Sequence, residues 1–230
     1  MKAAAIDLDG TLADTMGEIS AALQDLSQDL GLPAWDKSQV LAHTGRGTEH
    51  LIRQWLVSVN HSTDDMASLV QRFQEHYQHH LPRSRLYPDV LEGLQRLAAA
   101  DIPMVCTTNK PHAQAVSLLQ TLGIAGFFLD VIGPDSVGAR KPDPAMLQKA
   151  GEVLGKSPQE IIVIGDTDND VRAASNFGCP VICLTTGYGS CEDLLTLSMQ
   201  HPSLQLSMVE SFSAAVDCLL MQADMHTSSY

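Results

Sequence analysis

The chain has 230 residues, with 27 acidic against 14 basic side chains, which gives a formal net charge of −13 at pH 7. This charge opposes nucleic-acid binding through a broad basic face, and no apolar run reaches the roughly 20 residues needed to cross a bilayer. Five cysteines, an odd number at irregular spacing, argue against a disulfide framework.

Hydrophobic residues make up 44% of the chain, which is enough to bury a core domain and a smaller insert. The first acid of the chain, Asp7, comes too early to leave room for the apolar region of a signal peptide. A cytoplasmic protein is therefore expected.

The first predicted element is a buried strand at residues 3–7, which runs directly into two carboxylates. Asp7 and Asp9 stand one residue apart, and Gly10 lets the chain turn sharply after them. Because side chains alternate along a strand, both acids can lie on the same side. Such a pair can hold a cation, and one member can attack while the other moves protons. The structural alternative is an Asx-rich turn, in which Asp-Gly is a common dipeptide.

Residues 15–85 contain no apolar strand run and show helical periodicity instead. One helix is predicted to end at Gly31, and further helical stretches lie at 50–57 and 66–80. This pattern predicts an all-α insert joined to the rest of the chain by two hinges, which suits a cap that closes over a site. A histidine cluster in the insert lacks convincing ligand geometry and is interpreted as a solvated helix end. Its members are His76, His79 and His80.

The next predicted strand, at 103–107, leads into a hydroxyl, an amide and a cation. Thr108, Asn109 and Lys110 open a helix there, where backbone donors and a hydroxyl can bind an anion. Thr-Asn is also ordinary helix-start chemistry, and Lys110 could equally be a solvated lysine.

A strand at 128–132 comes before a loop that carries another cation. Lys141 is followed by Pro142 and Pro144, which hold it at the sheet edge, where it can neutralise a phosphate or a carboxylate nucleophile. Lys-Pro is common in loops, so this feature alone is weak evidence.

The strongest buried-strand run, at 161–165, also ends in acids: Asp166, Asp168 and Asp170. Strand ends in a parallel sheet point at the same crevice. If Asp166 and Asp170 converge with the first pair, each close pair repels by about 4 kcal/mol at about 4 Å and a dielectric near 20. Only a dication makes that tolerable, and ligands that are all oxygen favour Mg²⁺. The alternative is a helix start with acids in its first turn, and Asp168 fits that role.

The remaining elements continue the alternation of strand and helix. Helices are predicted at 88–100, 111–122, 143–154, 168–177 and 209–221. Strands are predicted at 180–184 and, as a short edge, at 204–206, with a loose polar tail at 225–230. The fold class is therefore α/β, a mostly parallel sheet wrapped on both faces by helices.

Taken in order, the four polar segments resemble the motifs of the haloacid dehalogenase-like hydrolase superfamily. The matches are Asp7-x-Asp9-Gly10-Thr11, Thr108-Asn109-Lys110-Pro111, Lys141-Pro142-x-Pro144 and Gly165-Asp166-x-x-x-Asp170. The resemblance covers nearly the whole chain and is closest to the phosphoglycolate phosphatase-like branch. Two departures from the family pattern are Ile6, where many relatives have an aromatic residue, and the loop 133–135, where relatives often have a second glycine.

The resemblance implies a Rossmann-like, doubly wound parallel core formed by residues 1–14 and 86–230, with an α-helical cap formed by residues 15–85. It also implies that Asp7 attacks a phosphoryl group to form an aspartyl-phosphate. Asp9 would protonate the leaving oxygen and later deprotonate the attacking water.

Further roles follow from the same resemblance. Mg²⁺ would be held by Asp7, the Asp9 carbonyl and Asp166, with Asp170 acting through water. Phosphate oxygens would be bound by Thr108, the Asn109 amide and Lys141. In the cap, Arg46 would bind a carboxylate or second phosphate of the substrate, and Thr15 beside the first hinge could also reach it. The alternative for Arg46 is a surface arginine between flexible glycines.

The expected function is Mg²⁺-dependent hydrolysis of a small phosphate monoester, such as phosphoglycolate. One alternative is a phosphoglucomutase-like transferase, although Ile19 and Ser20 stand where those relatives carry a histidine. Another is a catalytically idle binding relative. Phosphonate hydrolysis is disfavoured because Lys37 is the one lysine in the cap stretch. No nucleic-acid or membrane partner is expected, and the chain could be a monomer or a homodimer.

Overall fold

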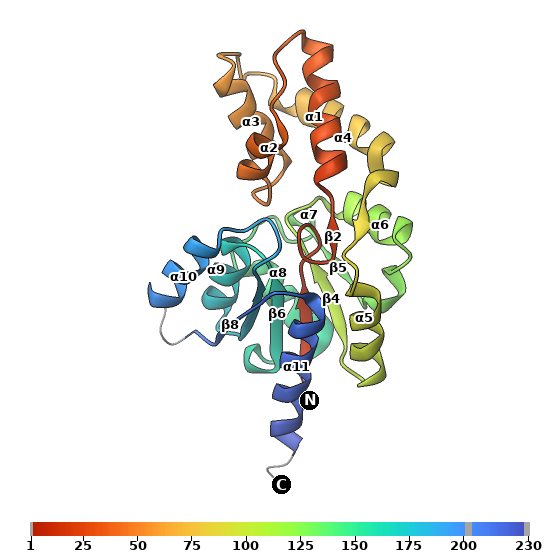
Figure 1. Ribbon diagram of the computed structural model, residues 1–230, viewed down its shortest axis with the longest axis vertical. Helices are drawn as coiled ribbons and strands as arrows, with labels where there is room; N and C mark the ends of the chain where they lie inside the picture. The colour runs from red at the N-terminus through yellow and green to blue at the C-terminus, as the bar shows by residue number, and fades with distance from the viewer. Residues whose placement is uncertain (1, 201–203, 228–230) are drawn as a thin grey trace. The chain divides into compact units, whose positions relative to one another are not determined.

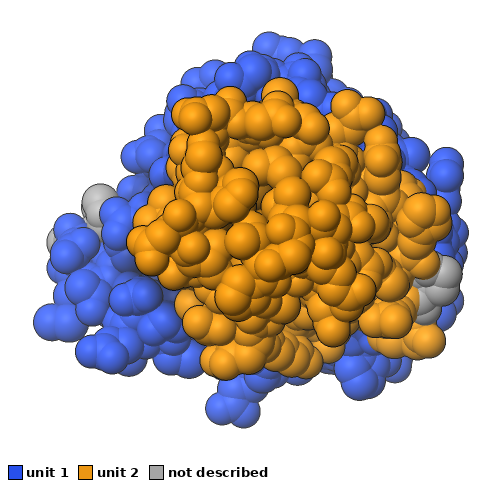
Figure 2. Space-filling view, turned by 90° about the horizontal axis from the view of Figure 1, so that it is seen from above, with its two compact units in different colours: residues 1–13, 86–230 blue, residues 14–85 orange. Residues whose placement is uncertain are grey.

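The computed structural model describes residues 2–200 and 204–227 (Figure 1). The chain divides into two compact units, coloured separately in Figure 2. Unit 1 comprises residues 1–13 and 86–230, and unit 2 comprises residues 14–85. The chain passes between them through β2 (Ala13–Asp14) and β3 (Arg85–Leu86), which form a two-stranded sheet.

Unit 1 is built on a six-stranded sheet in the order β5-β4-β1-β6-β7-β8, in which every neighbouring pair is parallel. The predicted α/β fold class is confirmed. Its strands are β1 (Ala3–Ile6), β4 (Met104–Thr107), β5 (Val131–Ile132), β6 (Ile161–Gly165), β7 (Val181–Leu184) and β8 (Leu206–Val209). β1, β4, β6 and β7 are buried along their whole length and apolar apart from Thr107 at the end of β4, as expected for a sheet covered on both faces.

Helices connect these strands and cover both faces of the sheet (Figure 1). They are α5 (Val90–Ala99), α6 (His112–Thr121), α7 (Pro134–Val137), α8 (Ala145–Leu154), α9 (Asp168–Phe177), α10 (Cys191–Gln200) and α11 (Phe212–Thr227). α8 packs on β1, β4 and β5, whereas α11 packs on α5, β7 and β8. Because side chains alternate along each strand, Ala5, Val105 and Val163 share one core with Met146 and Leu147 of α8.

Unit 2 is all helical apart from the short strands at its ends. Its helices are α1 (Met16–Leu30), α2 (Lys37–His43), α3 (Thr48–Ser58) and α4 (Met66–His80). α1 packs along α4, and the fully buried Trp55 donates its indole N–H to the Pro33 carbonyl at 2.9 Å. The helical periodicities predicted within residues 15–85 correspond to α1, α3 and α4.

The histidine cluster at the end of α4 was only partly predicted. His76 Nε2 lies 2.8 Å from Asp29 Oδ2, and His80 Nε2 lies 2.7 Å from Asp25 Oδ2, so both side chains join α4 to α1. His79 is exposed, as a solvated helix end requires. The sequence did not show that two of the three histidines face acids of another helix.

Several predicted boundaries were wrong near the sheet edges. The strand predicted at 128–132 is only Val131–Ile132, and Leu129 is 65% exposed at this edge. The edge strand expected at 204–206 is β8, at Leu206–Val209, so the helix predicted from residue 209 begins later.

The final helix begins at Phe212 because Ser211 caps it, with its hydroxyl accepting a hydrogen bond from the Ala214 N–H at 3.1 Å. It continues to Thr227 through part of the predicted tail, and residues 228–230 lie outside the described residues. α2, α7 and α10 were not predicted.

Among the described residues, none of the helices combines the length and the apolar character that a membrane span requires.

Gly93 in α5 provides a stability test of the packing between α5 and α11. A Cβ added there would lie 2.6 Å from Phe212 Cδ1 and 3.2 Å from Val216 Cγ2, both on α11. Replacing a glycine inside a helix by alanine usually makes the protein more stable. We expect Gly93→Ala to lower the free energy of unfolding instead, by about 1–3 kcal/mol, because α11 must shift.

The matched control for this test is Gly17→Ala in α1, where the added Cβ would meet its nearest neighbour, Arg83 Cβ, at an ordinary 3.8 Å. It should be neutral or stabilising. Chemical denaturation of both variants measures the difference. A stabilised Gly93→Ala variant would contradict the close contact.

Candidate active site

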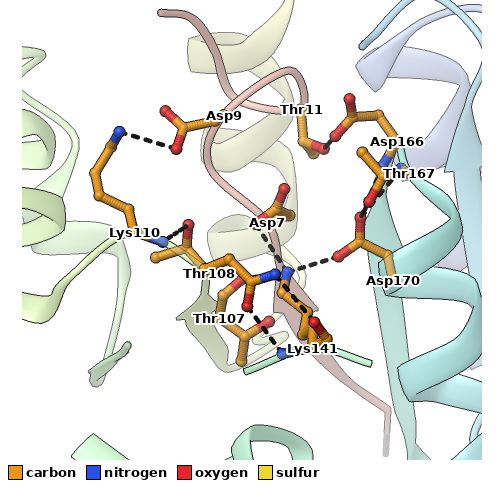
Figure 3. Close-up of polar contacts among 11 residues, drawn as sticks. Asp7, Asp9, Thr11, Thr107, Thr108, Lys110, Lys141, Asp166, Thr167 and Asp170 are labelled. Atoms are coloured by element: carbon orange, nitrogen blue, oxygen red, sulfur yellow. Dashed lines mark hydrogen bonds and ion pairs between the residues drawn. The ribbon is translucent and has the colours of Figure 1, made fainter. Parts of the chain in front are cut away.

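Three neighbouring strands place the predicted site residues at one edge of the sheet. β4, β1 and β6 are adjacent and parallel, so the residues that follow their carboxyl ends converge. Asp7 and Asp9 follow β1, Thr108 follows β4, and Asp166 follows β6. Lys141 comes from the loop between α7 and α8 and reaches the same place (Figure 3).

Lys141 is the centre of the site. Its ammonium donates to Asp7 Oδ1 at 2.8 Å, to the Thr107 carbonyl at 2.8 Å and to Asp170 Oδ1 at 2.6 Å. The side chain is only 3% exposed. Burial works to lower the pKa of this amine, but the adjacent carboxylates of Asp170 and Asp7 outweigh burial and raise it above its ordinary value. Lys141 is therefore a permanent positive charge, and its three donors are all engaged.

Asn109 fixes the backbone of Lys141. Its side-chain Oδ1 accepts from the Lys141 N–H at 2.8 Å, and its Nδ2 donates to the Lys141 carbonyl at 3.2 Å. This pair of bonds joins the loop after β4 to the loop before α8. The sequence did not suggest this holding role, and the predicted contact of Asn109 with substrate stays a prediction.

Three buried carboxylates lie close together, and two of them, Asp7 and Asp170, bind the Lys141 ammonium. Asp7, Asp166 and Asp170 each offer an oxygen, and these oxygens all lie within 4.8 Å of one another. Among the described residues, this is the one group of acids, histidines or cysteines with such spacing. An acid group this compact repels itself strongly unless a cation lies among its members.

Burial first, and then the repulsion between these acids, raise the pKa values of Asp7 and Asp166. Burial raises the pKa of Asp7 to about 7, although the charge of Lys141 opposes the rise. Burial, followed by the charges of Asp7 and Asp170, raises the pKa of Asp166 well above its ordinary value. Carboxylates clustered in this way fit a hard dication, and a donor set of oxygens alone fits Mg²⁺ better than a transition metal.

Neighbouring groups hold Asp166 and Asp170 in place. Asp166 accepts from the Thr11 hydroxyl at 2.7 Å and from the Tyr188 N–H at 2.6 Å. Asp170 accepts from the Thr167 hydroxyl at 2.7 Å and from the Thr167 N–H at 3.1 Å, at the first turn of α9. The sequence did not reveal the positioning roles of Thr11, Thr167 and Tyr188.

Two glycines leave room for Asp166. Gly10 turns the chain after β1 with a positive φ of 88°, and a Cβ there would overlap the Asp166 carboxylate. A Cβ at Gly187 would overlap the same side chain from the loop after β7. Both positions therefore require glycine for close approach, and Gly10 also requires it for its backbone conformation.

Asp9 and Lys110 form a second charged pair in the site. Lys110 Nζ lies 2.9 Å from Asp9 Oδ2, and the two side chains are 6% and 14% exposed. The Lys110 N–H also donates to the Thr108 hydroxyl at 3.2 Å. The alternative that Lys110 is a solvated helix-start lysine was wrong. Asp168, by contrast, lies in the first turn of α9 beside Arg172, as its alternative role predicted.

Seven of the nine predicted site residues lie in unit 1, and the structure brings them together. They are Asp7, Asp9, Thr108, Asn109, Lys141, Asp166 and Asp170. Arg46 and Thr15 belong to unit 2. Arg46 is exposed between two positive-φ glycines before α3, and Thr15 is buried at the start of α1.

Comparison with known proteins places this geometry in context. A family model described as haloacid dehalogenase-like hydrolase matches residues 5–184. The phosphoglycolate phosphatase of Thiobacillus denitrificans is 36% identical over 210 residues, which cover 89% of this chain and 92% of that protein. The phosphoglycolate phosphatase of Vibrio vulnificus strain YJ016 is 34% identical over 231 residues, which cover 97% of this chain and 98% of that protein.

A solved structure is also similar to this chain over nearly its whole length. The crystal structure of a predicted phosphoglycolate phosphatase from Haemophilus somnus superposes with a TM-score of 0.84 and 27% identity, over 95% of this chain and 97% of that one. The similarity therefore extends through both units and is not confined to the short motifs.

The acid cluster predicts stabilisation by Mg²⁺ that can be measured without any reaction. A ligand present at about 100 times its dissociation constant stabilises a fold by about 2.7 kcal/mol, which here raises the melting temperature by about 5–10 °C. Asp166→Asn removes one of the clustered charges, so most of this rise should be lost.

Asp168→Asn is the control, because Asp168 pairs with Arg172 and is not a member of the acid cluster. It should retain the wild-type rise. Thermal melts with and without Mg²⁺ measure the rise in melting temperature of each variant. A rise in Asp166→Asn equal to that of the wild type would rule out a cation among these acids.

Proposed function

Because the chain belongs to the haloacid dehalogenase-like hydrolase family and is a phosphoric monoester hydrolase, we propose that it hydrolyses a small phosphorylated metabolite of the phosphoglycolate type. The observation that carries the proposal is the buried Asp7 carboxylate. One of its oxygens is held by Lys141 at 2.8 Å, within a cluster of acids suited to a dication. Relatives of the phosphoglycolate phosphatase type that cover nearly the whole chain support the substrate class.

In the first step, an Asp7 oxygen forms a bond to phosphorus while the bond from phosphorus to the leaving oxygen breaks. Asp9 enters this step protonated and gives its proton to that leaving oxygen. An aspartyl-phosphate and a free alcohol result. The buried and unpartnered Asp9 Oδ1 supports this role, because it is a carboxyl oxygen that no described residue engages.

In the second step, water attacks the phosphorus of the aspartyl-phosphate and gives a proton to Asp9. The bond from phosphorus to Asp7 breaks, and its electron pair returns to the carboxylate. Inorganic phosphate leaves, and both acids regain their starting forms.

Lys141 and Thr108 would balance the charge of the transferring phosphoryl group. All three Lys141 donors already bind protein oxygens, so a direct bond from Lys141 to phosphate would replace one of these. Its main contribution is therefore a fixed positive charge close to Asp7. Thr108 and the backbone N–H of Asn109, in the loop after β4, would supply hydrogen bonds to phosphate oxygens.

Mg²⁺ would be held by Asp7, the Asp9 carbonyl and Asp166, with Asp170 acting through water. When bound, it supplies positive charge that offsets the repulsion between the Asp7 carboxylate and the phosphate dianion.

Unit 2 would act as the cap and determine which substrate is accepted. Arg46 stands between Gly45 and Gly47, just before α3, whose first turn receives no side-chain cap. A guanidinium at a helix N-terminus suits a carboxylate, and phosphoglycolate carries one. Thr15 at the start of α1 is proposed to help position the substrate.

The chain is proposed to act in the cytoplasm, as a monomer or a homodimer. All five cysteines are free thiols, which fits a reducing compartment. Its substrates would be small metabolites, not nucleic acids or membranes.

The direct test of the proposal is phosphate release from a panel of phosphate esters. The panel contains phosphoglycolate, hexose phosphates, nucleotides and pyrophosphate, with and without Mg²⁺. Asp7→Asn should lower kcat by at least about 1,000-fold, since it removes the nucleophile. A preferred substrate that loses turnover in Asp7→Asn supports the phosphatase.

Two other results would contradict that proposal. Absence of Mg²⁺-dependent phosphate release from every ester would indicate a binding protein. Transfer of the phosphoryl group between two hydroxyls of a sugar, with little release to water, would indicate a mutase.

Arg46→Ala tests carboxylate recognition separately. Loss of a charge-assisted bond should raise KM for phosphoglycolate by about 10- to 100-fold and leave KM for p-nitrophenyl phosphate, which lacks a carboxylate, nearly unchanged. Arg53→Ala is the control, because Arg53 pairs with Glu49 on the same helix. Equal changes in KM for both esters would exclude this role for Arg46.

A further inference from the structure

The Asp9–Lys110 pair is a buried ion pair that the proposed reaction does not require by itself. Lys110 Nζ lies 2.9 Å from Asp9 Oδ2, and both side chains are largely inaccessible to water. Figure 3 shows the Asp9 carboxylate turned toward Lys110, which extends to it from the loop after β4. Burying two charges is costly unless they are paired, so this contact needs an explanation in the function of Asp9.

We propose that Lys110 is a positioning residue for the proton transfer by Asp9. The inference rests on the proposed function, in which Asp9 gives its proton to the leaving oxygen. The Lys110 ammonium holds Asp9 through Oδ2 and leaves Oδ1 as the oxygen that carries the transferred proton.

The two Asp9 oxygens differ in their partners, and this difference supports the proposal. Oδ2 is engaged by Lys110, whereas Oδ1 is buried and accepts no hydrogen bond from any described residue. A buried carboxyl oxygen without a partner is rare in folded proteins unless it has a ligand or a chemical role. The carboxyl group is therefore fixed at one oxygen and available at the other.

Two features of the backbone around Lys110 restrict the direction of its side chain. The Lys110 N–H is bound to the Thr108 hydroxyl at 3.2 Å. Pro111 follows directly and is the N-cap residue of α6, and a residue before proline is restricted to extended conformations. Asp9 and Lys110 follow the neighbouring strands β1 and β4, so the sheet itself sets their separation.

The pair would matter most when the leaving group is poor. As the bond from phosphorus to the leaving oxygen breaks, the electron pair on that oxygen takes the Asp9 proton, and a negative charge appears on the Asp9 carboxylate. The Lys110 ammonium stabilises that charge, and it does so more strongly in a buried site than in water. A leaving oxygen that is stable as an anion needs no proton, so Lys110 should contribute little to its departure.

The test compares two phosphate esters in Lys110→Met. The specificity constant kcat/KM for phosphoglycolate, whose leaving group is an alkoxide, should fall by about 10- to 100-fold. For 2,4-dinitrophenyl phosphate it should stay within about threefold of wild type, because that leaving group needs no acid. Lys110→Arg keeps the charge and should recover most of the lost activity on phosphoglycolate.

Lys149→Met is the matched control, since Lys149 is an exposed lysine paired with Glu152 on α8. It should leave both rates unchanged. In an Asp9→Asn background, the added Lys110→Met change should have no further effect on the ratio of the two rates. If Lys110→Met does not fold, Lys110→Gln replaces it in the same comparison.

Failure of this inference is distinguishable from failure of the proposed function. Wild-type enzyme that is active and loses activity in Asp7→Asn upholds the function in either case. An equal fall in kcat/KM for both esters, no fall for either, or a persisting fall in the ratio in the Asp9→Asn background would overturn the role of Lys110.

Discussion

The site depends on one buried ammonium. Lys141 binds Asp7, Asp170 and the Thr107 carbonyl with its three donors, and these contacts join the ends of β1 and β4 to the start of α9. Without it, three buried carboxylates would face one another, each close pair repelling by about 4 kcal/mol at about 4 Å and a dielectric near 20. Two hydrogen bonds between the Asn109 side chain and the Lys141 backbone hold the segment that carries this charge. One cation does not neutralise the cluster, which is why the site suits a second, divalent one.

The parallel sheet is what allows such a cluster to exist. Acids at the ends of adjacent strands approach from different parts of the chain, while the apolar strands beneath them supply the stability that the cluster lacks. The backbone can approach the Asp166 side chain this closely only at residues without a Cβ, which are Gly10 and Gly187. The stability of the hydrophobic core thus supports a local arrangement that would be unfavourable alone, as is common at catalytic sites.

The sequence predicts the sheet and the acids well because both signals are local. Apolar runs that end in Asp7 and Asp166 indicate a strand and a candidate site together. Edge elements such as β5 and β8 carry weaker patterns, and their predicted bounds were wrong. The partners of site residues could not be predicted, since Asn109 with Lys141 and Lys110 with Asp9 join segments that meet only in the folded chain. Their motifs located the residues, but side-chain conformations decided the contacts.

The covalent role of Asp7 is the central claim, and chemical trapping tests it most directly. Enzyme mixed with phosphoglycolate and Mg²⁺ is quenched in acid and reduced with borohydride, which converts an aspartyl-phosphate to homoserine. Peptide mass spectrometry should find homoserine at position 7 and unmodified aspartate at position 9. Homoserine at another position, or none during steady turnover, would contradict nucleophilic attack by Asp7.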